Sequence, residues 1–215
     1  MGSVRIAALF DGTQWMRDAR VDLGDDGRVV AVAPAAGRPG ASASGPPVID
    51  GVVVPALPNL HSHAFQRGFA GRAEQRGARD RDSFWTWRTR MYAAAAALDP
   101  DRLRAVATSL YRELRAAGFG SVAEFHYVHH AADGRPYDDP FAMTDALVTA
   151  ADAAGIRLCV LPVLYQRRGF DDERPLDEQR RFVFDTDAYL WFLEGLQSRL
   201  RETRHRVGVA FHSLR

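Results

Sequence analysis

The sequence contains no lysine, because all 28 of its basic residues are arginines. This absence excludes a Schiff-base lysine, and a metal bridge built from a modified lysine, within these 215 residues. The single cysteine, Cys159, cannot form a disulfide within the chain, which fits a reducing compartment. Cys159 lies in an apolar run and is predicted to be a small core residue.

Long runs of one residue type are also missing. No apolar run approaches the roughly 20 residues that span a bilayer, and the first residues lack the pattern of a signal peptide. The net charge is +1 with no block of like charge, so we expect neither nucleic acid nor a membrane as a partner. The hydrophobic content of 47% supports a sizeable core, and we expect a cytoplasmic protein.

Residues 1–54 are predicted to form a small β module, the N-terminal part of a composite domain. Their apolar and polar residues alternate, and Asp-Gly pairs mark turns between the strands. The expected strands cover residues 4–10, 20–23, 28–33 and 48–54. The last of these is predicted to be a buried strand that leads directly into residues 55–66.

Two histidines, His61 and His63, follow that strand one residue apart. Side chains at i and i+2 of an extended chain point to the same face, and neutral imidazole nitrogens bind zinc and similar metals well. Most pairs with this spacing are incidental surface residues, but the preceding strand and the polar Gln66 favour a site. The spacing therefore predicts that His61 and His63 bind a metal.

The rest of the chain alternates between helix and strand patterns. Helices are expected over residues 82–97, 100–117, 140–154 and 187–201, and strands over 119–127, 156–165 and 207–211. This order is typical of a parallel α/β fold, either a doubly wound sheet or a barrel. Polar residues follow four of the strands, which favours a (β/α)8 barrel. These residues are His61, His63, Tyr127, Tyr165 and His212.

Four strands make half of such a barrel, and the sequence ends directly after a strand. We therefore expect an N-terminal fragment in which residues 55–215 form about strands 1–4 of an incomplete (β/α)8 barrel. Half a barrel exposes a strand edge and an apolar face, so these residues alone are expected to aggregate or to swap.

Five segments of the sequence carry a resemblance to a known family: residues 59–66 (NLHSHAFQ), 83–88 (SFWTWR), 121–130 (SVAEFHYVHH), 161–165 (LPVLY) and 212–215 (HSLR). Together they resemble the formimidoylglutamate deiminases of the amidohydrolase superfamily. The resemblance implies zinc-dependent hydrolysis of N-formimidoyl-L-glutamate to N-formyl-L-glutamate and ammonia, a step of histidine degradation. It also implies one zinc ion per subunit, with another divalent metal as the alternative, and it is compatible with a homodimeric full-length parent.

The resemblance assigns roles to single residues. It makes His61 and His63 the metal ligands, and it implies substrate contacts for the four residues Gln66, Tyr127, His212 and Arg215. The planar fork of Arg215 would suit a carboxylate of the substrate. The remaining metal ligands and the catalytic proton-transfer groups are expected beyond Arg215, so this part alone should bind metal weakly and be inactive. The absence of lysine favours a mononuclear site.

Other polar residues are predicted to have structural or surface roles instead of functional ones. His126, His129 and His130 are predicted to lie in or beside a loop and not to form a second metal site, and His205 is predicted to be solvated. Glu124 is expected to be structural, and the arginines of residues 67–81 to lie in a solvated loop. Two other functions stay open: an amidohydrolase that deaminates a cyclic base such as guanine or cytosine, and a catalytically dead binding protein.

Overall fold

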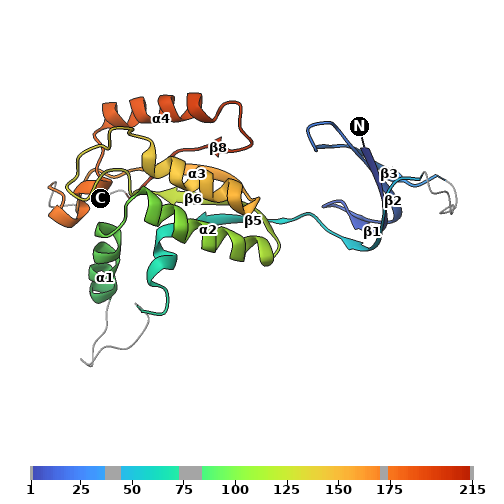
Figure 1. Cartoon of the computed structure of the whole chain (residues 1–215), viewed down its shortest axis with the longest axis horizontal. Helices are drawn as coiled ribbons and strands as arrows, with labels where there is room; N and C mark the ends of the chain where they lie inside the picture. The colour runs from blue at the N-terminus through green and yellow to red at the C-terminus, as the bar shows by residue number, and fades with distance from the viewer. Residues whose placement is uncertain (1, 37–44, 73–83, 170–173, 214–215) are drawn as a thin grey trace. The chain divides into compact units, whose positions relative to one another are not determined.

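The computed structural model describes residues 2–36, 45–72, 84–169 and 174–213, without the side chain of Trp85 (Figure 1). The chain divides into two compact units, Met1–Ala56 and Leu57–Arg215, which are considered separately. Among the helices in the described ranges, none is long and apolar enough to cross a bilayer.

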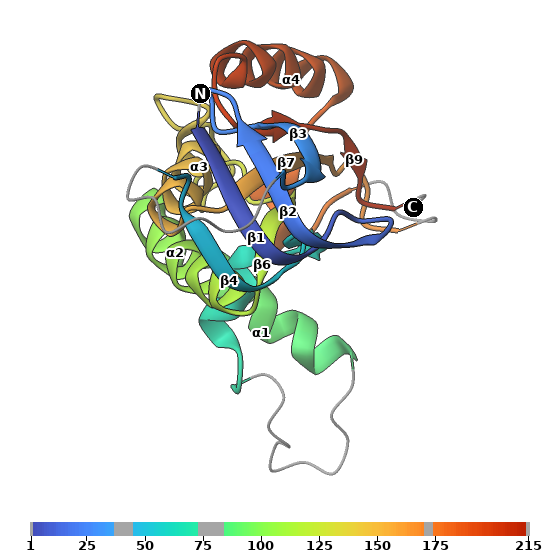
Figure 2. The same cartoon turned by 90° about the vertical axis from the view of Figure 1, so that its right-hand side faces the viewer.

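The first unit is a four-stranded sheet in the order β3-β2-β1-β4 (Figure 2). Both the β1–β2 and the β2–β3 pairs are antiparallel, whereas β1 and β4 run parallel, so the sheet is mixed. Its small core consists of Ile6, Leu9, Ala19 and Val21. All four predicted strands are present, with β2 starting five residues earlier than expected. Their bounds are β1 Gly2–Phe10, β2 Trp15–Leu23, β3 Val29–Pro34 and β4 Val48–Val53.

The predicted buried strand leading into the histidines is wrong. β4 pairs with β1 in the first unit, and the side chain of Val52 is 68% exposed. A separate strand, β5 (Leu57–Ser62), carries His61. Pro55 lies between the two strands, and its missing N–H cannot continue a ladder of hydrogen bonds, which explains why the strand pattern breaks there.

The second unit contains a parallel sheet in the order β5-β6-β7-β8, with β9 also paired to β7. The predicted strand 207–211 is in fact two short strands on either side of Gly208, which packs so closely on Leu161 that a Cβ atom would clash. Among the described residues the sheet is open, with β5 and β8 at its edges. The bounds are β6 Phe119–His126, β7 Arg157–Leu164, β8 Arg206–Val207 and β9 Ala210–Phe211.

Helices follow these strands, and α2 and α3 lie against one face of the sheet (Figure 1). The side chain of Asp99 accepts a hydrogen bond from Arg102 N at 2.8 Å and caps α2 as predicted. Gly155 ends α3 with a φ of 69°, a conformation that favours glycine. The helix bounds are α1 Phe84–Ala96, α2 Pro100–Ala116, α3 Ala142–Ala154 and α4 Thr186–Leu200. The cap expected for α1 at residues 82–83 lies outside the described residues.

Two short 3-10 helices, η1 (Ala64–Phe69) and η2 (Asp177–Phe182), lie outside the predicted helices and strands. Phe65 and Phe69 of η1 are buried in the main core, so the start of the predicted solvated arginine loop is anchored. The remainder of that loop, from residue 73, lies outside the described residues.

The second unit thus has parallel strands joined by helices that cover one face. The predicted class is confirmed: the chain is α/β and forms part of a (β/α)8 barrel preceded by a small β module. Alternate residues of β6 show the two faces of the sheet. Val122, Glu124 and His126 are buried, whereas Ser121 and Phe125 on the opposite face are half-exposed.

Candidate metal and substrate site

The side chains of His61 and His63 converge as their spacing predicts. Their Nε2 atoms are 3.0 Å apart. His63 Nδ1 lies 3.2 Å from the backbone oxygen of Phe125. Because a carbonyl oxygen can only accept, His63 carries its proton on Nδ1, which leaves the lone pair of Nε2 available to a metal. The backbone of His61 is fixed by its N–H, which donates to Asn59 Oδ1 at 3.0 Å.

Electrostatics keep His63 in the form that binds metals. Burial, followed by the nearby charge of His61, lowers the pKa of His63 from 6.5 to about 4, while the hydrogen bond to Phe125 opposes this shift. The imidazole is therefore neutral at pH 7, and ligation does not first have to remove a proton from it.

The two imidazoles fit two positions of a zinc shell. Zn–N bonds of roughly 2.0–2.1 Å at tetrahedral angles separate two ligand nitrogens by about 3.3 Å, close to the observed spacing. In the described part of the chain, His, Cys, Asp and Glu side chains form no group of three or more that could hold a metal ion. The residues present thus supply part of a metal shell.

A cavity of about 240 Å³ opens beside His63. Three of the four residues predicted to contact substrate line it, namely Gln66, Tyr127 and His212. Gln66 Nε2 donates to the hydroxyl of Tyr127 at 3.2 Å, and the rings of Tyr165 and His212 lie 4.0 Å apart between centroids. The fourth predicted residue, Arg215, lies outside the described residues. The other lining residues are Phe84, Trp87, Arg88, Met91, Tyr92, Phe125 and Tyr165.

Helix α1 contributes polar groups that sequence reasoning did not single out. Arg88 lines the cavity, and its Nε donates to the hydroxyl of Tyr92 at 2.7 Å. Gln179 of η2 is 1% exposed and donates to the hydroxyls of Tyr92 and Tyr165, at 2.8 and 2.6 Å. Arg88 lies in one of the five segments that carry the family resemblance, so the sequence could have indicated its role. Gln179 lies in a polar stretch outside these segments, and its sequence context does not indicate a role.

The three neighbouring histidines behave as core residues. His126 and His129 are buried with ring centroids 4.9 Å apart, and His129 also packs against Phe184. Burial, followed by the charge of Arg181, lowers the pKa of His126 to about 3. Burial likewise lowers the pKa values of His129 and His130. All three are therefore neutral at pH 7.

The prediction that His205 is solvated is wrong. The side chain is 1% exposed, and its Nδ1 accepts a hydrogen bond from Leu158 N at 3.1 Å. Its Nε2–H therefore donates to Asp152 Oδ1, also at 3.1 Å. His205 therefore accepts the backbone N–H of Leu158 in β7 and, through Asp152, ties this strand to α3. The arginine-rich sequence around His205 gives no sign of this role.

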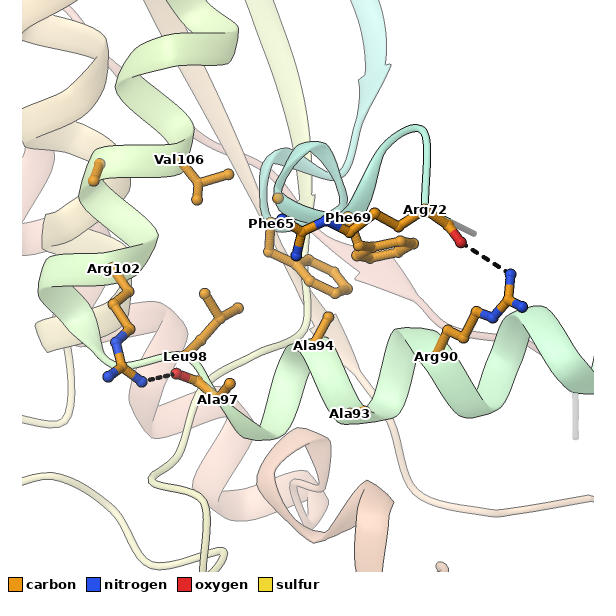
Figure 3. Close-up of a pocket in the computed structure, with 12 residues that line it drawn as sticks. Phe65, Phe69, Arg72, Arg90, Ala93, Ala94, Ala97, Leu98, Arg102 and Val106 are labelled. Carbon is orange, nitrogen blue, oxygen red and sulfur yellow. Dashed lines mark hydrogen bonds between the residues drawn. The ribbon is translucent and has the colours of Figure 1, made fainter. Parts of the chain in front are cut away.

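A second cavity, of about 800 Å³, lies between η1, α1 and α2 (Figure 3). Its walls include Phe65 and Phe69, and Arg90 Nη1 donates to the backbone oxygen of Arg72 at 2.9 Å beside it. Of the predicted metal and substrate residues that the structure describes, none lines this cavity.

Comparisons with known proteins agree with this geometry. No protein-family model matches the chain. A curated formimidoylglutamate deiminase from Pseudomonas aeruginosa is 46% identical over 201 residues, which are 94% of this chain and 43% of that protein. The chain is similar to formimidoylglutamate deiminases. The resemblance seen in the five segments is therefore confirmed.

Solved structures support the same relationship. An amidohydrolase from Brucella melitensis is 37% identical and has a TM-score of 0.89, with 100% of this chain and 47% of that one covered. The zinc complex of atrazine chlorohydrolase from Arthrobacter aurescens is 21% identical with a TM-score of 0.68, and it covers 98% of this chain. At that identity the likeness concerns the fold alone. The chain spans less than half the length of each of these relatives.

Proposed function

We propose that the complete protein hydrolyses N-formimidoyl-L-glutamate to N-formyl-L-glutamate and ammonia with the help of a divalent metal, zinc in the first instance. The observation that carries this proposal is a single cavity in which His63 meets Gln66, Tyr127 and His212, next to His61. The similarity to formimidoylglutamate deiminases supports the choice of reaction.

The metal would be held by the Nε2 atoms of His61 and His63, and by ligands from the remainder of the complete protein. A bound zinc ion would supply Lewis acidity that lowers the pKa of a water molecule to about 7. The contact of His63 Nδ1 with Phe125 orients the ring, so that Nε2 faces His61 instead of turning away. Proton transfer to the departing ammonia is assigned to residues outside this chain.

The cavity suits a small acidic substrate. The guanidinium of Arg88 offers a positive charge inside it, and we propose that Arg215 provides a second one, because the substrate carries two carboxylates. Burial raises the pKa of Tyr127 well above 10, so its hydroxyl stays protonated. That oxygen accepts from Gln66, and its own proton points to Met91 Sδ at the long distance of 4.0 Å, a weak contact that a substrate oxygen can replace.

The experiment measures ammonia release by the protein made from the complete reading frame, with and without added zinc. We expect metal-dependent release from N-formimidoyl-L-glutamate that is lost in His61→Ala and His63→Ala. His130→Gln serves as a histidine control, because its ring contacts the backbone of Val183 away from the cavity and should leave activity intact.

Two outcomes would change the proposal. Turnover of guanine or cytosine without turnover of N-formimidoyl-L-glutamate would keep the metal site and reject the substrate. A complete absence of turnover, with zinc bound, would favour a binding protein over an enzyme.

A further inference from the structure

Glu124 is a buried carboxylate directly behind the two histidines. It lies on the outward face of β6, is 2% exposed, and accepts the N–H of Ala64 on Oε1 at 2.5 Å. Its other oxygen, Oε2, accepts the hydroxyl of Tyr111 from α2 at 3.2 Å. Ser62, the residue paired with Glu124 across the β5–β6 ladder, also hydrogen-bonds to this carboxylate.

These contacts involve the residues on either side of His63. Because side chains alternate along a strand, Ser62 points toward the helices while His61 and His63 point to the opposite face. The residue after Glu124 in β6, Phe125, takes the Nδ1–H of His63 on that opposite face. Two consecutive residues of β6 therefore fix His63. Glu124 binds the residues before and after it in the chain, and Phe125 binds its imidazole ring.

If this position only had to be filled, an apolar side chain would give a more stable protein than a carboxylate. Burying an ionisable group costs free energy that an apolar side chain of similar size would avoid. What the carboxylate adds is three acceptor contacts at one place, including one to a backbone N–H that has no other described partner. It fixes the turn at which β5 ends and η1 begins, directly after His63.

We propose that Glu124 is a positioning residue for the metal: by fixing the backbone around His63, it aims the Nε2 atoms of His61 and His63 at one point. Glu124 does not touch the metal itself. The inference rests on the proposed function only in taking these histidines as ligands. Loss of a group that orients a metal ligand typically weakens metal binding by roughly 10- to 100-fold.

The test is the affinity for Co²⁺, measured from its absorption spectrum in the protein made from the complete reading frame after zinc removal. In Glu124→Ala we expect Co²⁺ to bind at least about 10-fold more weakly, with an altered spectrum. In Glu124→Gln we expect affinity within about 3-fold of wild type, because the amide oxygen can still accept from Ala64.

A matched control separates positioning from general loss of stability. Val122→Ala removes a buried side chain from the same face of β6, two residues earlier, and should lower the melting temperature while leaving Co²⁺ affinity within about 2-fold. If Glu124→Ala does not fold, Tyr111→Phe, which removes one of the contacts to Glu124, should weaken Co²⁺ binding by more than the 2-fold range of the control, although by less than the loss expected for Glu124→Ala.

Each result decides the matter. Wild-type affinity in both Glu124→Ala and Tyr111→Phe, or an equal loss in Val122→Ala, would overturn the positioning role and leave the proposed function standing. If the His61→Ala and His63→Ala variants bound Co²⁺ as tightly as the wild type, both the positioning role and the proposed function would be overturned. Loss of ammonia release with unchanged Co²⁺ affinity would also contradict a role through the metal ligands.

Discussion

Gln179 and Tyr165 are joined by a buried hydrogen bond of 2.6 Å between the side-chain amide and the phenol hydroxyl. The same amide nitrogen donates to Tyr92 at 2.8 Å, so η2 connects β7 to α1 beneath the cavity. Both tyrosines line that cavity. Gln179, which is not among the described residues that line the cavity, thus holds two of its walls in place.

Replacing Gln179 by leucine should therefore destabilise the protein. The hydroxyls of Tyr92 and Tyr165 would each lose one hydrogen bond, and Leu176 N would lose its acceptor, Gln179 Oε1, at 2.8 Å. An unsatisfied buried polar group costs about 1–3 kcal/mol. The measurement is the free energy of unfolding from urea denaturation of the complete protein. The neighbouring Glu178→Gln change, at an exposed position, should stay within about 0.5 kcal/mol. Equal effects in the two variants would contradict the structural role of Gln179.

Tyr127→Phe should weaken substrate binding more than it weakens the fold. The hydroxyl is proposed to donate to a charged substrate, and such a hydrogen bond contributes about 1.5–3 kcal/mol, or roughly 10- to 100-fold in KM. Steady-state kinetics on N-formimidoyl-L-glutamate measure this effect. Tyr189→Phe is the control, because its hydroxyl donates to Pro162 O at 2.8 Å within the core and should change stability without changing KM. An unchanged KM in Tyr127→Phe would remove Tyr127 from the substrate site.

The pH dependence of stability should report on Glu124. Burial raises its pKa from 4.5 to about 7, although hydrogen bonds from Ala64, Ser62 and Tyr111 oppose this shift. A raised pKa means that the folded state prefers the protonated form. The stability contributed by that proton is therefore fully present below pH 4.5 and lost as the pH rises to about 7, by up to roughly 3 kcal/mol.

Comparison with Glu124→Gln isolates this contribution. The glutamine cannot ionise, so the variant should gain stability relative to wild type between pH 4.5 and 7. The buried His63 and His126, with pKa values lowered to about 4 and about 3, act in the opposite sense, because stability is lost as the pH falls below 6.5. They are present in both proteins and cancel in the difference. A difference that does not change with pH would contradict the raised pKa of Glu124.

His205→Ala should be more damaging than the arginine-rich sequence around it suggests. The change removes a buried ring and leaves Leu158 N without its acceptor, so we expect a loss of about 2–4 kcal/mol. Asp152→Asn, which alters only the half-exposed partner of that ring, should cost less than about 1 kcal/mol. Thermal denaturation of the two variants tests the order, and a reversed order would be inconsistent with the burial of His205.

The sequence predicted what depends on local pattern. Helix α2 was recognisable from Asp99 and Pro100 at its start, and the convergence of His61 and His63 followed from two-residue periodicity. The same reasoning failed where pairing partners decide. Val52 lies in an apolar run that is typical of a buried strand, but this strand pairs with β1 and Val52 stays exposed. The local pattern could not identify β1 as the partner, because β1 is far away in the sequence. The sequence analysis missed the burial of His205 and Gln179, because elements that are distant in the sequence cover them and the local sequence shows no periodic pattern.

The polypeptide of exactly these 215 residues should self-associate in solution. In the described residues, β5 and β8 have free edges, and Leu60 at one edge is 76% exposed while Phe211 near the other is 66% exposed. Exposed edges with apolar side chains pair readily with other chains. Light scattering coupled to size-exclusion chromatography should therefore give a mass well above 23.8 kDa.

Replacing Leu60 and Phe211 by charged residues should shift the mass toward that of the monomer, whereas the same replacement at the exposed Leu190 of α4 should not. A monodisperse monomer with a cooperative thermal transition would contradict this prediction, because it would mean that the open sheet is stable without a partner.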